Sequence, residues 1–507
     1  MHRRLLLLLS IGLLVACSDD PGVSSERANT AATSASAPVT APADTGSTAP
    51  VGTDEPSSTD ASTTSEVAGA TGDGVGDALF PDLGNPGLDV THYDVTIEYD
   101  HDAGDLQGSV GLDVTLTQDR GEITLDSSGP EVTEVTVDGT AATFTPDDPE
   151  LRITLPSAGH SGDRLRVEVA YHLQPAPGFS GTGLPTGWFN TPDGSYVLNE
   201  PEGARTWLPS NDHPSDKATY TFTITVAKGV TAVANGEMVD QRSEGDRDVW
   251  VWQEDRPMTT YLIQMETGPY DIVEGVGPHG LPLVSVVLHD DRATMQPLID
   301  VTPDMITFFE PYFGPYPLDR YGIAVTDSSS GLAMETQERS LFSRDDLGSG
   351  ELGQIENLLL SHELAHQWFG DAVSPARWQD VWLNESFATY GEWMWMEHAG
   401  FGTVNQSAIS ALAQRPPGSS ADPTVENLFS TNSYQGGAVV LHALRLTIGD
   451  DAFFKVLSQW VSTNNGTSQT TEDFVAFAEK VSGVPLADFF DTWLYAESPP
   501  RSYPKGM

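Results

Sequence analysis

Cysteine and basic side chains are both scarce in this chain of 507 residues. The single cysteine, Cys17, excludes an intrachain disulfide, so the folded state depends on its core for stability. Only 24 lysines and arginines stand against 73 aspartates and glutamates, which gives a formal net charge of −49. Such a surface repels phosphate backbones, so we expect no nucleic-acid partner. The same charge is compatible with solubility, with adaptation to salt and with attraction of cationic peptides.

Long apolar runs are also missing, and the one short run lies at the N-terminus. Two arginines precede residues 5–16, an apolar stretch too short to span a bilayer as a stable helix. The stretch ends in Leu-Val-Ala-Cys at Cys17, which resembles the lipobox of bacterial lipoproteins. The resemblance implies a signal peptide over residues 1–16, lipidation of Cys17, and an exported protein anchored to the outer face of the bacterial membrane. An ordinary secretory signal that contains a cysteine is the alternative.

Residues 17–76 have almost no large apolar side chain, which excludes a packed core there. Ser, Thr, Ala, Pro, Gly and Asp dominate this segment. It cannot bury enough surface to offset the entropy lost on ordering. About 60 flexible residues have a root-mean-square reach of roughly 40 Å. We therefore predict a disordered tether that holds the folded part away from the membrane.

Residues 77–275 show the two-residue period of β-strands. Apolar and polar residues alternate around Val95–Tyr99, Val110–Leu116 and Tyr220–Val226. Clusters of Gly, Pro and Asp separate these stretches. The pattern predicts a β-rich domain in which each sheet buries one face.

Residues 276–507 change mostly to helical spacing. Strands are still expected at 284–288 and 322–325. Helices are expected at 303–312, 351–370, 384–399, 436–448, 451–463, 471–482 and 486–496. The sequence thus predicts two folded domains, with the second mostly helical.

The motif His362-Glu363-Leu364-Ala365-His366, followed by Glu385, carries the chemistry. On a helix, residues four apart share a face, so His362 and His366 can bind the same metal ion. Glu363 projects to the side of that line, where a general base can reach water at the metal. Two imidazoles with the Glu385 carboxylate leave a fourth tetrahedral position open, as in a catalytic zinc site. Buried core histidines are the alternative, because Leu358, Leu359, Leu360 and Leu364 give the same helix a core-facing stripe.

Several further motifs make the chain resemble the aminopeptidase N family of zinc metallopeptidases. The resemblance runs from about residue 88 to the C-terminus. The motifs that carry it are Pro201-Glu202-Gly203-Ala204-Arg205 through Lys217-Ala218, Phe313-Gly314-Pro315-Tyr316-Pro317, Leu332-Ala333-Met334-Glu335-Thr336, His362 to Asp371, Asn384-Glu385-Ser386-Phe387-Ala388 and Tyr434-Gln435-Gly436-Gly437-Ala438. The zinc motif alone is shared by many metallopeptidases, whereas the set is specific.

The resemblance implies a fold, a cofactor and roles for further residues. It implies an antiparallel, saddle-like β domain over a thermolysin-like α+β catalytic domain that binds one Zn²⁺, with peptides that have a free N-terminus as substrates. Glu335 then binds the substrate's α-amine, and Glu200 is a second amine-binding carboxylate from the β domain. Leu332, Ala333 and Met334 supply a backbone edge for the substrate. Tyr434 donates a hydrogen bond to the tetrahedral oxyanion.

Two departures from the family concern the substrate site. Leu332 replaces a glycine and Thr336 an asparagine of the family motif, so the subsite preference is open. Larger members continue with a β-sandwich and a long helical domain, which have no counterpart here. A more open active site that tolerates longer peptides is therefore expected.

Other functions share parts of this pattern. A thermolysin-type endopeptidase has the same zinc ligands but lacks the amine-binding glutamates. A surface protein that keeps the fold only for binding is the second alternative, although every expected catalytic residue is present. The sequence does not indicate the preferred N-terminal residue or the oligomeric state.

Overall fold

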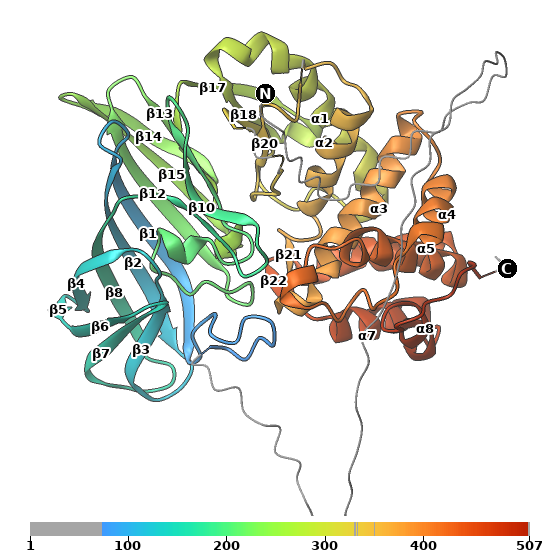
Figure 1. Ribbon diagram of the computed structural model, residues 1–507, viewed down its shortest axis with the longest axis horizontal. Coiled ribbons are helices and arrows are strands. Elements are labelled where there is room, and N and C mark those ends of the chain that lie inside the picture. The colour runs from blue at the N-terminus through green and yellow to red at the C-terminus, as the bar shows by residue number, and fades with distance from the viewer. Residues whose placement is uncertain (1–73, 329–330, 332, 349, 505–507) are drawn as a thin grey trace, which may run out of the picture. The chain divides into compact units, whose positions relative to one another are not determined.

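The computed structural model describes residues 74–504, apart from 329, 330, 332 and 349 (Figure 1). The predicted signal peptide, Cys17 and nearly all of the predicted tether lie outside the described residues, as does Leu332. Among the described helices, none combines the length and the apolar character that crossing a membrane requires.

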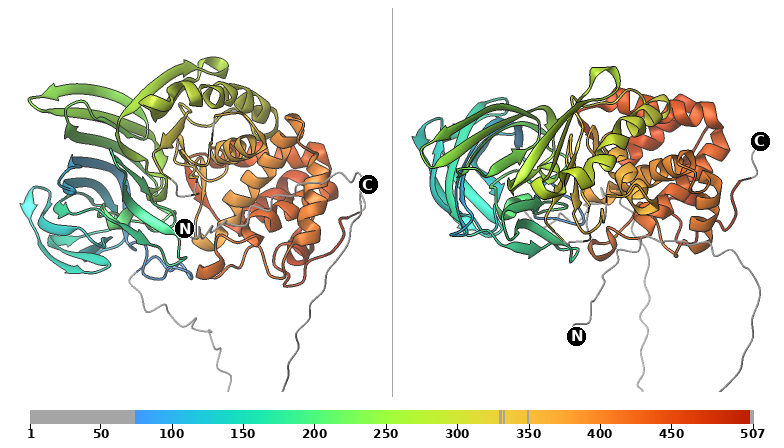
Figure 2. Two further views of the ribbon diagram at one scale, coloured as in Figure 1. Left: turned by 45° about the horizontal axis from the view of Figure 1, so that its top comes forward. Right: turned by 90° about the horizontal axis from the view of Figure 1, so that it is seen from above.

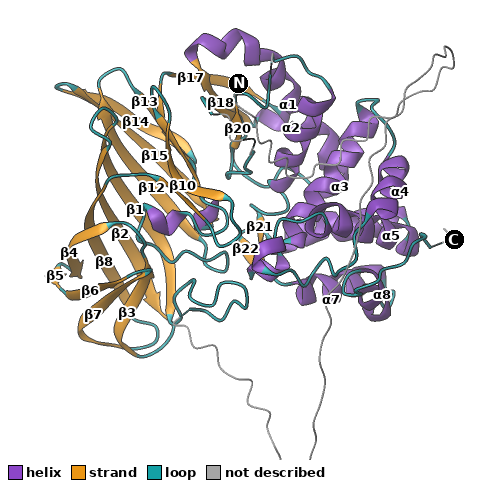
Figure 3. Cartoon of the chain, in the orientation of Figure 1, coloured by secondary structure: helices purple, strands orange, loops and turns teal. Residues whose placement is uncertain are grey.

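An eight-stranded sheet forms the main part of the N-terminal β-rich domain (Figure 3). In spatial order its strands are β14 (Glu237–Glu244), β15 (Arg247–Met258), β12 (Ala218–Ala227), β1 (Leu88–Asp100), β2 (Asp105–Leu116), β8 (Arg164–Leu173), β4 (Glu131–Val137) and β5 (Thr140–Ala141). The predicted alternation is present in β12, where Tyr220, Phe222 and Ile224 are fully buried and the residues between them are half-buried. One pair departs from the antiparallel expectation, because β1 and β12 run parallel.

Two smaller sheets complete this domain. The five-stranded sheet contains, in spatial order, β13 (Thr231–Ala234), β16 (Met265–Gly268), β11 (Ser195–Leu198), β10 (Pro185–Asn190) and β9 (Pro177–Phe179). The three-stranded sheet contains β3 (Arg120–Asp126), β7 (Glu150–Gly159) and β6 (Thr143–Asp147). Strand β11 leads directly to Glu200, so the five-stranded sheet positions that carboxylate.

The rest of the chain is a mixed, mainly helical domain. Its strands are β17 (Tyr270–Val276), β18 (Pro282–Leu288), β19 (Ile323–Thr326) and β20 (Ser340–Ser343) in one sheet, and β21 (Val373–Pro375) with β22 (Thr467–Gln469) in another. Its helices are α1 (Arg292–Phe313), α2 (Gln354–His366), α3 (Trp382–His398), α4 (Val404–Gln414), α5 (Gly437–Ile448), α6 (Asp450–Asn464), α7 (Thr471–Ser482) and α8 (Ala487–Trp493). The expected fold class, a β-rich domain followed by a helical α+β domain, is confirmed.

Three helix predictions need correction. Helix α1 begins at Arg292 instead of 303, since it continues through Pro297, Pro303 and Pro311. Helix α2 ends at His366 instead of 370, because Gly370 adopts a φ of 134° in a tight turn. Helix α4 was not expected at all, and its N-terminus is capped by the Thr403 side chain, which accepts a hydrogen bond from the backbone of Gln406.

The two parts of the chain share a continuous buried core. Trp378, Val381 and Leu428 from the mainly helical domain belong to the same hydrophobic cluster as the strand residues of the β domain. Figure 2 shows the β-rich domain and the mainly helical domain side by side from two further directions. The five tryptophans near the zinc motif are buried, as expected for core residues: Trp368, Trp378, Trp382, Trp393 and Trp395.

Arg339 is a buried polar link between the domains. Its Nε donates to the carbonyl of Val284 at 2.8 Å, and its Nη1 donates to the carbonyl of Ala234 at 3.1 Å and to Oε1 of Gln264 at 2.7 Å. The guanidinium also lies 5.3 Å from the ring centroid of Trp252. The segment that carries Glu335 is thereby fixed to the β domain.

We predict that Arg339→Leu lowers the free energy of unfolding by on the order of 3 kcal/mol, because it leaves buried acceptors without donors. Chemical denaturation measures this change. The control is Arg242→Leu, which removes exposed ion pairs to Asp240 and Glu244 and is expected to change the free energy of unfolding far less. Equal effects of the two substitutions would contradict the assigned role of Arg339.

Candidate zinc centre

Helices α2 and α3 bring the three predicted ligands together. Nε2 of His362 lies 3.3 Å from Oε2 of Glu385, and Nε2 of His366 lies 3.4 Å from the same oxygen. The two Nε2 atoms are 3.2 Å apart. All three residues are at most 9% exposed. The three donor atoms thus form a small, nearly equilateral triangle in a buried position.

These separations fit a tetrahedral zinc ion. Zinc binds imidazole nitrogen and carboxylate oxygen at about 2.0–2.2 Å, which places neighbouring ligands of a tetrahedron roughly 3.3–3.5 Å apart. The donor set is also one that zinc prefers. Burial alone would raise the pKa of Glu385. Hydrogen bonds from His362 and His366 outweigh the effect of burial and hold this pKa at about 2. The carboxylate is therefore ionised and ready to bind a cation.

The second nitrogen of each histidine ring has its own partner. Nδ1 of His362 lies 3.5 Å from Oε2 of Glu392, and Nδ1 of His366 lies 3.1 Å from the carbonyl of Phe369. Such partners fix the orientation and tautomer of a ligating histidine. The sequence-based prediction missed Glu392. Its position seven residues after Glu385 on the same helix face was a usable signal.

Glu363 lies beside the ligands but outside the triangle. Its carboxylate, that of Glu335 and a ring nitrogen of His366 approach one another to within 4.8 Å. Burial raises the pKa of Glu363 to about 7, although His362 and His366 oppose the shift. A cation at the ligands would lower this pKa. Glu363 is thus placed to exchange a proton with water at the centre.

Glu335 and Glu200 are the two other carboxylates of the site. Oε1 of each is buried and has no hydrogen-bond partner among the described residues. Burial raises the pKa of both groups, and Glu335 is the neighbouring charge that raises the pKa of Glu200 most. Glu200 and Glu335 therefore come from different domains and influence each other's charge, and Glu335 lies beside Glu363 and His366. Such a pair is stabilised by a cation with several hydrogen-bond donors.

The segment around Glu335 is held in an extended form. Met334 forms backbone hydrogen bonds in both directions with Leu341, at 2.9 and 2.7 Å. The side-chain amide of Gln367, the residue after His366, donates to the carbonyl of Glu335 at 3.3 Å. Ala333 lies half-buried beside Met334. These contacts fix Glu335 relative to the end of α2.

Tyr434 reaches the centre from a π-helical turn, Asn432–Gly436. Its ring is stacked on that of His362, with centroids 5.9 Å apart and an interplanar angle of 19°. The Ser386 hydroxyl donates to the carbonyl of Ser433 at 2.6 Å and so ties this turn to α3. Burial raises the pKa of Tyr434 well above its usual value, and the negative charges of Glu385 and Glu200 raise it further. The phenol is therefore a neutral hydrogen-bond donor near pH 7.

Two aspartates near the zinc motif, Asp371 and Asp380, are buried rather than exposed at the surface. Asp380 Oδ1 accepts hydrogen bonds from the backbone and hydroxyl of Thr471 at the start of α7. Among the described residues, neither carboxylate contacts the ring of His362 or His366.

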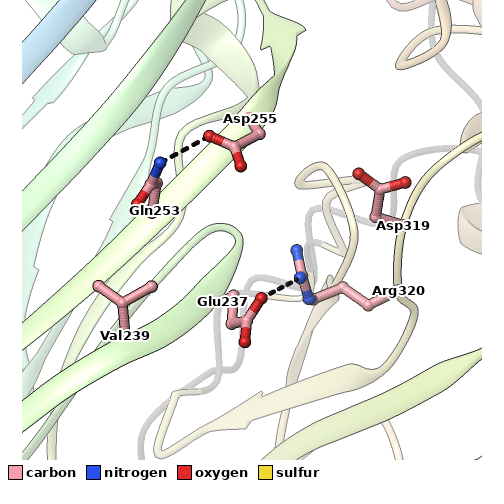
Figure 4. Close-up of a pocket in the computed structure, with 6 residues that line it drawn as sticks. All are labelled: Glu237, Val239, Gln253, Asp255, Asp319 and Arg320. Carbon is pink, nitrogen blue, oxygen red and sulfur yellow. Dashed lines mark hydrogen bonds and ion pairs between the residues drawn. The ribbon is translucent and has the colours of Figure 1, made fainter.

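A separate polar pocket of about 350 Å³ lies away from these residues. It is lined by Glu237, Val239, Gln253, Asp255, Asp319 and Arg320 (Figure 4). Arg320 extends toward Glu237 at 3.4 Å and also donates to Glu338 at 2.6 Å. Its charge is therefore compensated within the protein, and none of the lining residues belongs to the candidate zinc centre.

Comparison with known proteins agrees with this description of the site. Residues 90–262 match the Peptidase M1 N-terminal domain, and residues 298–493 match the Peptidase family M1 domain. Among solved structures, an M1 zinc metallopeptidase from Deinococcus radiodurans is similar, with 30% identity and a TM-score of 0.78. The match covers 86% of this chain and 100% of that one. A variant of the same Deinococcus protein was crystallised with a Tyr-Ser-Ala substrate.

Curated relatives are longer than this chain. Probable aminopeptidase 2 of Sulfurisphaera tokodaii is 29% identical over 408 residues, which are 75% of this chain and 51% of that protein. Glutamyl aminopeptidase of Bos taurus is 30% identical over 320 residues, 58% of this chain and 33% of that protein. The matches thus span about half of the first relative and about a third of the second. On the two matched domains and the structural match, the chain belongs to peptidase family M1, and its buried triad of side chains fits a zinc ion.

Proposed function

We propose that the protein is a zinc aminopeptidase that removes residues one at a time from the free N-terminus of peptides. The observation that carries the proposal is the pair of carboxylates beside the zinc ligands, the buried Glu335 and the half-buried Glu200, whose Oε1 is itself buried. Zinc ligands alone are common to exopeptidases and endopeptidases. A site for a terminal ammonium at a fixed distance from the zinc selects the first peptide bond.

We assign the metal to His362, His366 and Glu385. When bound there, zinc supplies a Lewis acid that activates water and polarises a peptide carbonyl. Glu363 accepts the proton from the attacking water and delivers it to the departing amine. Tyr434 donates a hydrogen bond to the developing oxyanion, a contribution typically worth about 2.7–4 kcal/mol. Glu335 and Glu200 hold the substrate's ammonium, while the extended backbone at Ala333 and Met334 supports its first residues.

The decisive experiment compares one peptide in free and N-acetylated forms. Mass spectrometry follows both after incubation with the zinc-loaded protein. We expect stepwise loss of single residues from the free peptide and no cleavage of the acetylated peptide, because acetylation removes the ammonium. Internal cleavage of both forms would instead identify an endopeptidase. No cleavage of either form would favour a binding protein, provided that a Glu363→Gln variant behaves identically.

A second prediction concerns Glu335. Glu335→Gln keeps the shape of the side chain but removes its charge. We expect kcat/KM for the free peptide to fall by about 30- to 1,000-fold, since losing one partner of a buried charge pair costs roughly 2–4 kcal/mol. Steady-state kinetics measure the effect. Glu356→Gln, in the first turn of α2, is the matched control and should leave kcat/KM nearly unchanged. Among the residues that the structure describes, the half-buried Glu356 side chain accepts a hydrogen bond only from the Gly353 backbone nitrogen, which glutamine can also accept.

We further propose that the protein is an exported lipoprotein held on the outer face of the membrane through Cys17. The N-terminal sequence supports this placement, as set out above. Metabolic labelling with a fatty acid tests it in cells that process bacterial lipoproteins. The label should appear in the full-length protein and disappear in Cys17→Ser. Persistent labelling of Cys17→Ser, or secretion of the unaltered protein into the medium, would contradict the anchor.

A further inference from the structure

The turn directly after the second zinc histidine is held by side chains of the β domain. The hydroxyl of Tyr261 donates to the carbonyl of Gly370 at 3.3 Å. Nζ of Lys217 donates to the carbonyl of Asp371 at 2.6 Å and lies 3.5 Å from that of Ala372. Three consecutive carbonyls of the catalytic domain are thus bound by two residues that lie more than 100 positions earlier in the chain.

This turn determines where the His366 ring lies. The backbone nitrogen of Asp371 donates to the carbonyl of His366 at 3.0 Å, and the carbonyl of Phe369 contacts Nδ1 of the ring at 3.1 Å. Gly370 passes so close that an added Cβ would lie 3.3 Å from the same Nδ1. A shift of the turn would therefore move the partner of Nδ1 and rotate Nε2 away from the metal position.

Tyr261 also contacts the helix that carries the third ligand. Nδ2 of Asn384, the residue before Glu385, donates to the Tyr261 hydroxyl at 3.0 Å. The tyrosine is 1% exposed, and its ring packs edge-on against Trp378 with centroids 5.2 Å apart. One fixed phenolic oxygen thereby joins the turn after α2 to the first turn of α3.

We propose that Tyr261 and Lys217 are positioning residues of the zinc centre, so that the β domain helps to build the metal site as well as the substrate site. Removing the Tyr261 hydroxyl leaves the amide of Asn384 and the carbonyl of Gly370 buried without this common partner. The two ligand-bearing segments can then relax independently. The 3.2–3.4 Å spacing of the three donor atoms is lost, and zinc affinity falls. The inference rests on the zinc centre and does not require peptidase activity.

The chain contains a matched control for this hydroxyl. Tyr220 is another buried tyrosine of the β domain, and its hydroxyl donates to a backbone carbonyl, that of Met258, at 3.3 Å. Within the described part of the chain, its hydroxyl contacts neither a predicted zinc ligand nor a neighbour of one. Tyr220→Phe and Tyr261→Phe therefore remove the same atom from similar surroundings, and only Tyr261→Phe acts next to the ligands.

The test measures the zinc dissociation constant of the full-length protein by competition with a chromophoric chelator. Partners of this kind typically contribute 10- to 100-fold to metal affinity. We expect Tyr261→Phe to weaken zinc binding at least 10-fold, Lys217→Met to weaken it in the same direction, and Tyr220→Phe to leave it within about twofold. Circular dichroism before each titration verifies that the variants are folded.

The proposal is overturned if Tyr261→Phe binds zinc as tightly as Tyr220→Phe while both have lowered melting temperatures. That result would make Tyr261 a residue of general structural importance only. Because the readout is zinc affinity, the outcome is independent of the peptide experiments. If the protein lacked aminopeptidase activity, the result on zinc affinity would still stand. If Tyr261→Phe left zinc affinity unchanged, the proposed aminopeptidase activity would not be affected.

Discussion

Mutual repulsion among buried carboxylates is the constraint on which this site depends. The carboxylates concerned are those of Glu200, Glu335, Glu363 and Glu385. The negative charges of neighbouring carboxylates in this group help to raise the pKa values of Glu200, Glu335 and Glu363. In a medium of low effective dielectric constant, such charges are stable together only when cations accompany them. In the proposed function, a zinc ion at the triad and a terminal ammonium at the pair Glu200 and Glu335 supply those cations. Substrate binding is thereby coupled to the electrostatic balance of the site.

The fold provides the rigidity that this arrangement requires. Two proposed ligands come from one helix, the third comes from the next, and the tyrosine comes from a π-helical turn. The proposed amine-binding pair spans both domains, because Glu200 follows strand β11 and Glu335 precedes strand β20. Buried hydrogen bonds of Arg339 and Tyr261 join the β domain to the mainly helical domain. The distance from the ammonium site to the metal can then define which peptide bond reacts.

Local sequence was sufficient for part of this description. The spacing of His362 and His366 predicts two ligands on one helix face, and the two-residue period of β12 predicts its buried face. Resemblance to a family was needed for Glu200, Glu335 and Tyr434, because these residues lie on separate segments. The fold brings these residues together, and their spacing along the sequence does not indicate that they are close. The sequence-based prediction placed the start of α1 too late, because prolines usually mark helix boundaries.

The contacts that Tyr261 and Lys217 make with distant segments were not predicted from the sequence. Tyr261 and Asn384 are separated by 123 positions, and Lys217 and Asp371 by 154. Nothing in either local sequence indicates the partner. Glu392 is an intermediate case, since its helix face was predictable but its contact with His362 depends on how α2 packs against α3.

The most direct measurement is a crystal structure of the Glu363→Gln protein with zinc and an uncleaved peptide, with anomalous data collected at the zinc edge. The account predicts one anomalous peak between His362, His366 and Glu385, and the peptide's ammonium between Glu200 and Glu335. A peptide that runs through the site with its N-terminus elsewhere would contradict the account. So would a metal bound by other residues.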